Sequence, residues 1–285
     1  MAKKNSKKEN PSILWRIIKW IFRNIWKLIK WVYNLLTKGA KKGVEKTKLM
    51  ANKTYNSEPK SEEFVLIEEI KGDYKLFEEK IQNDSLILII FGKRGSGKSS
   101  LGFRILENIH YKTKRKCYVL GIDKILIPKW IKSVGSVEEA PDSGIILIDE
   151  GAVSFGSRDS MSSKNKELSK IMAVARHKNL TLIFVTQNTG LIDRNVLALT
   201  DALFIKEGSL LQMEMERPEV KKFYEKSNDY LKKVEDDKKK YFYLIDSDFE
   251  GVLTYGLPSF WSDKLSRNKA KSEKQRAPHL ERCGL

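Results

Sequence analysis

The sequence predicts an α/β fold in which a mainly parallel β-sheet is flanked by helices. Residues 85–91, 116–122, 144–149 and 180–186 form separate apolar runs, each of the length of a buried strand. Apolar runs without alternation are typical of parallel strands that are covered on both faces. The intervening stretches are compatible with helices, and 285 residues suffice for one such domain of about 200 residues with appendages.

The first apolar run leads directly into the sequence GKRGSGKS at residues 92–99. The pattern G-x-x-x-x-G-K-[ST] between a strand and a helix is a phosphate-binding loop. Its glycines let the backbone fold around a phosphate chain, and its N–H groups and the next helix N-terminus point at negative charge. Lys98 is expected to reach the β- and γ-phosphates of ATP, and the Ser99 hydroxyl to hold Mg²⁺. The predicted ATP-binding residues are Gly92, Lys93, Arg94, Gly95, Ser96, Gly97, Lys98, Ser99 and Ser100.

Two adjacent acidic residues stand at the end of the third apolar run: Asp149 is its last residue and Glu150 follows it. In a phosphoryl-transfer site we expect Asp149 to organise Mg²⁺ together with Ser99, and Glu150 to polarise the attacking water. An ordinary strand end followed by a helix cap is the alternative. The phosphate-binding loop 50 residues upstream favours the catalytic interpretation.

A polar residue, Gln187, ends the next apolar run, residues 180–186. Another strand, at residues 116–122, lies in sequence between the strands that carry Ser99 and Asp149. This order resembles the additional-strand, catalytic-glutamate branch of P-loop NTPases. The resemblance implies that Gln187 senses the γ-phosphate; a surface amide at a strand end is the alternative.

The sequence of residues 175–187, ARHKNLTLIFVTQ, resembles that of the FtsK/HerA superfamily of DNA-pumping ATPases. Among its members the Zot-like and viral genome-packaging ATPases look most similar, because in them an Arg-His pair precedes a strand that ends in Thr-Gln. The resemblance covers about residues 85–210. It implies a RecA-like sheet, a hexameric ring, ATP hydrolysis at subunit interfaces and a polymer, DNA above all, that passes through the pore.

A ring ATPase needs an arginine from the neighbouring subunit to stabilise charge on the γ-phosphoryl group. Arg158, Arg176 and Arg194 are the alternatives, and each could equally be a solvated surface residue. Arg176 is favoured because it lies in the stretch that carries the family likeness.

The net charge of +17 is concentrated at the two ends of the chain. Residues 1–54 carry a net charge of +13 and residues 264–285 one of +5, so the remainder is close to neutral at −1. Basic ends suit anionic partners, either nucleic acid or a phospholipid surface. Two cysteines exclude a disulfide framework, and three scattered histidines indicate no metal site of their own.

Residues 12–36 predict an amphipathic helix at a membrane interface. At about 100° per residue, the cations of this segment fall within an arc of about 80°. Four of the six tryptophans lie off that stripe, and such a helix favours anionic lipid headgroups. A spanning helix is opposed by its five cations, at up to about 3 kcal/mol each, and packing on partner subunits is the third alternative. The cations are Arg16, Lys19, Arg23, Lys27 and Lys30.

The sequence therefore predicts four parts: the helix in residues 1–36, a flexible linker in 37–62, a P-loop ATPase domain in 63–263 and a disordered basic tail in 264–285. We expect an ATP hydrolase that drives DNA translocation from a membrane, on the cytoplasmic face or in a virion. An assembly or export factor that moves no nucleic acid is the alternative. A kinase is disfavoured, because a water-activating Glu150 would waste its phosphoryl group.

Overall fold

The computed structural model describes residues 54–149, 161–262 and 264–265, together with isolated residues between 20 and 52. Residues 161–163, 210 and 212 are described in their backbone alone. The predicted catalytic Glu150 and most of the predicted basic helix, linker and tail lie outside the described residues. Contacts divide the chain into two units, Met1–Lys53 and Thr54–Leu285. The described residues of the second unit are called the α/β body below.

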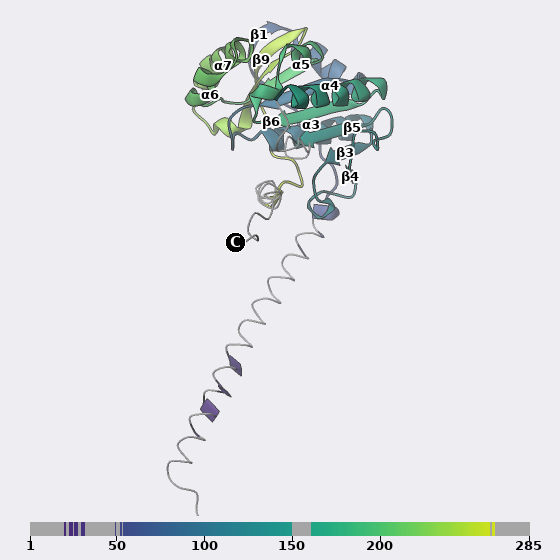
Figure 1. Cartoon of the computed structure of the whole chain (residues 1–285), viewed down its shortest axis with the longest axis vertical. Helices are drawn as coiled ribbons and strands as arrows, with labels where there is room; N and C mark the ends of the chain where they lie inside the picture. The colour runs from purple at the N-terminus through teal and green to yellow at the C-terminus, as the bar shows by residue number, and fades with distance from the viewer. Residues whose placement is uncertain are drawn as a thin grey trace, which may run out of the picture. The chain divides into compact units, whose positions relative to one another are not determined.

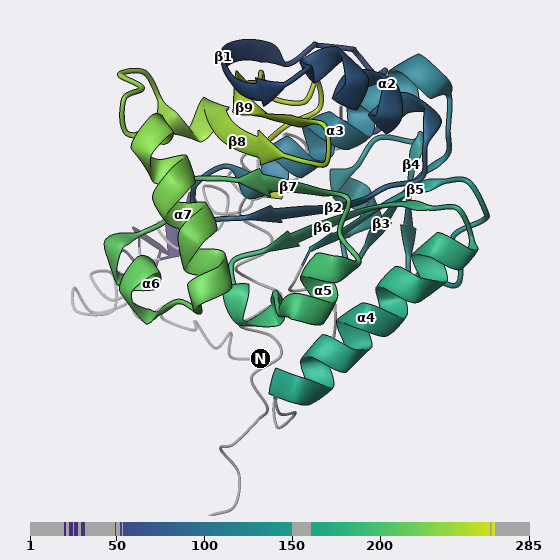
Figure 2. The same cartoon turned by 90° about the horizontal axis from the view of Figure 1, so that it is seen from above.

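The α/β body is shown in Figure 1. Within its described residues it contains a nine-stranded sheet in the order β1-β9-β8-β7-β2-β6-β5-β3-β4, whose strands are all labelled in Figure 2. The strands from β7 to β4 in this order are parallel, whereas β8, β9 and β1 continue the sheet antiparallel. The predicted mainly parallel α/β sheet is thus confirmed. The strands are β1 (Val65–Gly72), β2 (Ile87–Phe91), β3 (Cys117–Leu120), β4 (Ile131–Val134), β5 (Ile145–Asp149), β6 (Thr181–Thr186), β7 (Ala202–Ile205), β8 (Tyr241–Ile245) and β9 (Phe249–Thr254).

Helices cover both faces of this sheet (Figure 2). Alternate residues of β2 take part in two separate cores: Leu88 and Ile90 in the core with α2 and α3, Ile87 and Ile89 in the core with α4, α5 and α7. A strand buried on both faces in this way needs an unbroken apolar run. The helices are α2 (Tyr74–Asn83), α3 (Lys98–Thr113), α4 (Met161–His177), α5 (Arg194–Ala198), α6 (Leu210–Met215) and α7 (Pro218–Leu231), with 3₁₀ turns η1 (Lys124–Leu126), η3 (Thr189–Leu191) and η4 (Lys238–Lys240).

The strand inserted between β2 and β5 in space is β6. The strand at residues 116–122, here β3, does lie between them in sequence, but in the sheet it lies beyond β5. Phe91 of β2 pairs with Thr186 of β6, and Asp149 of β5 pairs with Val185. Because the three strands are parallel and in this register, the phosphate-binding loop, Gln187 and Asp149 all follow from one edge of the sheet.

Before Thr54 the structure describes few residues, and all of them are helical. Trp20, Trp26 and Trp31 are each more than half exposed, and the Lys30 ammonium lies 5.9 Å from the centre of the Trp26 ring. Among the described residues, no helix is both long enough and apolar enough to cross a membrane.

Candidate nucleotide site

The loop between β2 and α3 has the backbone conformation that a phosphate-binding loop requires. Gly97 has φ 89°, a left-handed value that favours glycine. A Cβ atom at Gly97 would lie 2.7 Å from the carbonyl oxygen of Lys239. A Cβ atom at Gly92 would lie 2.7 Å from the Cβ of Lys206. Both glycines are therefore needed for the close approach of β7 and η4 to the loop.

Lys98, the first residue of α3, turns its side chain back into the loop. Its ammonium donates to the carbonyl oxygens of Gly92 at 2.9 Å and Lys93 at 2.7 Å. The neighbouring Lys93 side chain instead pairs with Glu207, which follows β7. The loop thus holds one ammonium at its centre and directs the other one outward, and Arg94 is exposed.

Ser99 and Asp149, the two residues predicted to hold a metal, lie close to each other at the carboxyl ends of the strands. The Ser99 hydroxyl donates to Asp149 Oδ2 over 3.4 Å. A hydroxyl and a single carboxylate are oxygen ligands of the kind that Mg²⁺ uses when phosphates and water complete its shell. These two residues fit Mg²⁺, since its usual sites in nucleotide enzymes need only one or two protein ligands.

Two other predicted site residues directly follow β5 and β6. Glu150 follows Asp149 directly but lies outside the described residues. Gln187 is exposed at the end of β6, between the loop strand and the Asp149 strand. Their predicted roles, water activation and γ-phosphate sensing, stay predictions.

The arginines proposed to act in trans lie in different places. The Arg176 guanidinium pairs with Asp201 at 3.1 Å, and Asp201 also accepts a hydrogen bond from the N–H of Ile87, the first residue of β2. Arg176 is therefore at the opposite sheet edge from the loop of its own subunit. Arg194 pairs with Glu219 at 2.7 Å, and Arg158 lies outside the described residues. The action of Arg176 on a neighbouring subunit stays a prediction.

A buried lysine and a buried tyrosine, neither of them predicted from the sequence, support the loop from behind. Lys206 follows β7; its ammonium donates to the carbonyl oxygens of Lys239, at 2.8 Å, and Tyr241, and lies 4.8 Å from the Tyr255 ring centre. The Tyr255 hydroxyl donates to Gly97 O at 2.8 Å. A polar residue at the end of an apolar strand was the one available signal for Lys206.

Burial strongly lowers the pKa of the Lys206 ammonium below its ordinary value; Asp237 opposes this shift, and Lys98 adds to it. Between that lowered pKa and about 10.4, the unfolded chain binds a proton at this residue that the folded chain does not. We therefore expect Lys206 to contribute a free energy of unfolding that rises with pH in this window. Urea titrations at several pH values should show a steeper rise for the wild type than for Lys206→Met. A difference between the two proteins that does not change with pH would contradict this.

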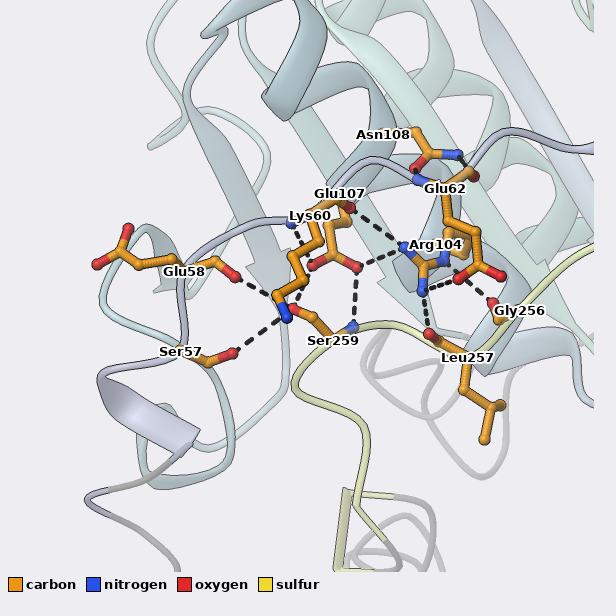
Figure 3. Close-up of polar contacts among 10 residues, drawn as sticks. All are labelled: Ser57, Glu58, Lys60, Glu62, Arg104, Glu107, Asn108, Gly256, Leu257 and Ser259. Carbon is orange, nitrogen blue, oxygen red and sulfur yellow. Dashed lines mark hydrogen bonds and ion pairs between the residues drawn. The ribbon is translucent and has the colours of Figure 1, made fainter.

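One face of α3 binds two segments that are distant in sequence, residues 57–62 and 256–259 (Figure 3). Arg104 and Glu107, 2% and 0% exposed, form an ion pair of 3.1 Å on this face. Arg104 donates to the carbonyl oxygens of Lys60, Gly256 and Leu257, and also pairs with Glu62.

Glu107 accepts from the N–H groups of Lys60 and Ser259, both at 3.0 Å. Asn108 exchanges two hydrogen bonds with the backbone of Glu62. Part of the segment that the sequence places in the linker is therefore bonded to the helix that follows the phosphate-binding loop.

No protein-family model and no curated protein matches the chain. Solved structures do match. The genome packaging NTPase B204 from Sulfolobus turreted icosahedral virus 2, in complex with AMP, is 14% identical with a TM-score of 0.44, over 61% of this chain and 100% of that one. The pCW3 conjugation coupling protein TcpA with ATPgS is 13% identical with a TM-score of 0.44, over 78% and 72%. EssC (ATPases 2 and 3) from Geobacillus thermodenitrificans is 11% identical with a TM-score of 0.40, over 79% and 52%.

The predicted P-loop NTPase fold is confirmed by the order of the strands. The loop at residues 92–99 follows β2, the strand that ends in Asp149 is β5, and β6 lies between them. This is the strand arrangement of the additional-strand branch. The chain thus has the fold of a P-loop NTPase of that branch, which includes the FtsK/HerA-type ATPases that its sequence resembles.

Proposed function

We propose that this protein hydrolyses ATP and uses the reaction to translocate double-stranded DNA. The observation that carries the ATPase part is the meeting of Ser99 with Asp149, 3.4 Å apart, beside a phosphate-binding loop that is closed around Lys98. A hydroxyl, a carboxylate and a central ammonium are the groups that a nucleoside triphosphate with its metal requires.

The residues divide the work of hydrolysis between them. The loop N–H groups and Lys98 bind the phosphate oxygens and stabilise the charge that develops on them. Ser99 and Asp149 would hold Mg²⁺, which when bound would supply positive charge to neutralise that of the phosphates. Glu150 takes a proton from the attacking water while the water oxygen forms a bond to the γ-phosphorus. The bond between the γ-phosphorus and the oxygen that bridges it to the β-phosphate breaks, which gives ADP and phosphate.

The choice of DNA rests on the sequence. The sequence of residues 175–187 resembles the FtsK/HerA ATPases, and both chain ends are strongly basic. We further propose that the protein acts as a homo-hexamer, in which Arg176 of one subunit reaches the site of the next and Gln187 couples the γ-phosphate to movement. Residues 12–36 hold it on an anionic membrane surface, on the cytoplasmic face or in a virion membrane.

One assay separates this function from its alternatives. ATP hydrolysis is measured with and without double-stranded DNA, for the wild type and for Glu150→Gln. We expect DNA to stimulate hydrolysis and Glu150→Gln to abolish it. Hydrolysis that is indifferent to DNA would favour an assembly or export factor, and phosphate transfer to an added acceptor without hydrolysis would indicate a kinase.

Membrane attachment is tested separately. A fusion of residues 1–40 to a soluble reporter is expected to bind vesicles that contain anionic lipid, and to be released as salt rises. A fusion that ignores such vesicles would contradict the interfacial helix.

A further inference from the structure

A basic groove lies on the face of the sheet that is covered by α4 and α5. Its volume is about 840 Å³. We call it the α4–α5 groove. Its polar lining includes Asn165, Lys166, Ser169, Lys170, Asn195 and Arg217.

The groove is positively charged, and its cations are exposed to solvent. Lys166, Lys170 and Arg217 are exposed, and none of them forms an ion pair with another residue of the described ranges. The one carboxylate in the lining, Asp193, is already bonded, because it accepts from the N–H of Val196 at 2.9 Å and from Asn165 Nδ2 at 2.8 Å. Three cations therefore face one carboxylate that is engaged elsewhere.

The spacing of the cations suits a chain of phosphates. Lys166 and Lys170 are one helical turn apart, so they lie on the same side of α4, about 6 Å apart along its axis. Arg217 comes from the turn between α6 and α7 and adds a third cation from another element. A phosphodiester backbone carries a negative charge at every nucleotide, so one strand can contact cations that come from different elements.

The walls of the groove are joined to the strand ends of the nucleotide site. Helix α4 is the first described element after Asp149, and η3 and α5 are the first elements after Gln187. Thr189 of η3 donates to Glu216, the residue before Arg217. The chain therefore runs from each of these strand ends into a wall of the groove.

We propose that the α4–α5 groove binds the phosphodiester backbone of DNA and links it to the nucleotide site. This rests on the proposed DNA-translocating function and names the surface that grips the strand. The buried Asn165 adds a polar anchor: its Oδ1 has no hydrogen-bond partner within the described part of the chain, and a base amino group of a bound strand would supply a donor.

The test compares two triple variants of the full-length protein with equal loss of charge. The groove variant is Lys166→Ala/Lys170→Ala/Arg217→Ala. The control variant is Lys75→Ala/Lys124→Ala/Lys132→Ala, which removes three exposed lysines outside the groove. Both are first checked for the wild-type unfolding midpoint. DNA binding is then measured by the fluorescence anisotropy of labelled double-stranded DNA at several salt concentrations. ATP hydrolysis is measured at increasing concentrations of DNA.

For the groove variant we expect unchanged basal hydrolysis and a DNA concentration for half-maximal stimulation that is at least about tenfold higher. The slope of log affinity against log salt should fall by about 3, close to 0.9 for each lost phosphate contact. The control variant should keep the wild-type values. The basic chain ends are present in all three proteins, so their contribution to binding cancels in the comparison.

Three results would overturn the proposal. If DNA stimulates the wild type and both variants equally, the groove does not bind DNA although the proposed function stands. If the groove variant alone changes its oligomeric mass in sedimentation while its DNA response is intact, the groove is an interface between copies. If the wild type neither binds nor responds to DNA, the proposed function itself fails, and this inference fails with it.

Discussion

Replacement of Lys98 by methionine is expected to lower the rate of ATP hydrolysis by about 10²–10³-fold, the usual effect of removing one donor that stabilises transition-state charge. The physical reason is position: the Lys98 ammonium lies at the centre of the loop, between the carbonyl oxygens of Gly92 and Lys93. When the loop holds a γ-phosphate, the Lys98 ammonium would bind the phosphate oxygens in place of these two carbonyl oxygens. Steady-state hydrolysis at saturating ATP measures the effect on kcat.

Lys93→Met is the matched control, since it makes the same substitution in the same loop. The Lys93 side chain pairs with Glu207 and leaves only its backbone to the nucleotide. We expect a loss of less than about tenfold, within the range of a surface ion pair. Equal losses in the two variants would mean that the loop acts through its total charge and that Lys98 has no special place in it.

Replacement of Arg104 by alanine is expected to lower the free energy of unfolding by about 3–5 kcal/mol. The substitution leaves the carboxylate of Glu107 at 0% exposure without its cation, and it also removes the donor to the carbonyl oxygens of Lys60 and Gly256. Unfolding in guanidinium chloride, followed by tryptophan fluorescence, measures the change.

The matched control for Arg104 lies two turns further along the same helix. Lys112 pairs with Glu63 at 3.3 Å and Glu78 at 2.9 Å on the surface, so Lys112→Ala is expected to cost less than about 1 kcal/mol. A smaller loss for Arg104→Ala than for Lys112→Ala would show that the buried pair does not stabilise the body.

Those parts of the fold that depend on local sequence could be predicted. The strands β2, β5 and β6 can be recognised as apolar runs, because a strand buried on both faces needs an unbroken run. The loop after β2 can be recognised by its phosphate-binding motif. The strand β4, Ile131–Val134, was missed, because its sequence IKSV is short and half polar at the edge of the sheet.

Features that depend on distant parts of the chain could not be predicted. The position of β6 between β2 and β5 is a matter of topology, which the order along the chain does not reveal. Arg104 and Glu107 would be solvated on an isolated helix, and they are buried only because residues 57–62 and 256–259 cover them. The contact of Tyr255 with Gly97 joins residues that are 158 apart, and no local pattern announces it.

The hydrogen bonds of residues 57–62 determine where the chain can be shortened. A truncated protein that starts at β1 would lack the N–H of Lys60 and the carboxylate of Glu62, and it would leave the buried face of α3 open to water. A protein that starts at Thr54 keeps these contacts and lacks the entire net charge of +13 that the N-terminal end carries. We expect the longer fragment to be the smallest one that keeps the stability of the intact body, which makes it the one to choose for crystals and for assays free of the basic end.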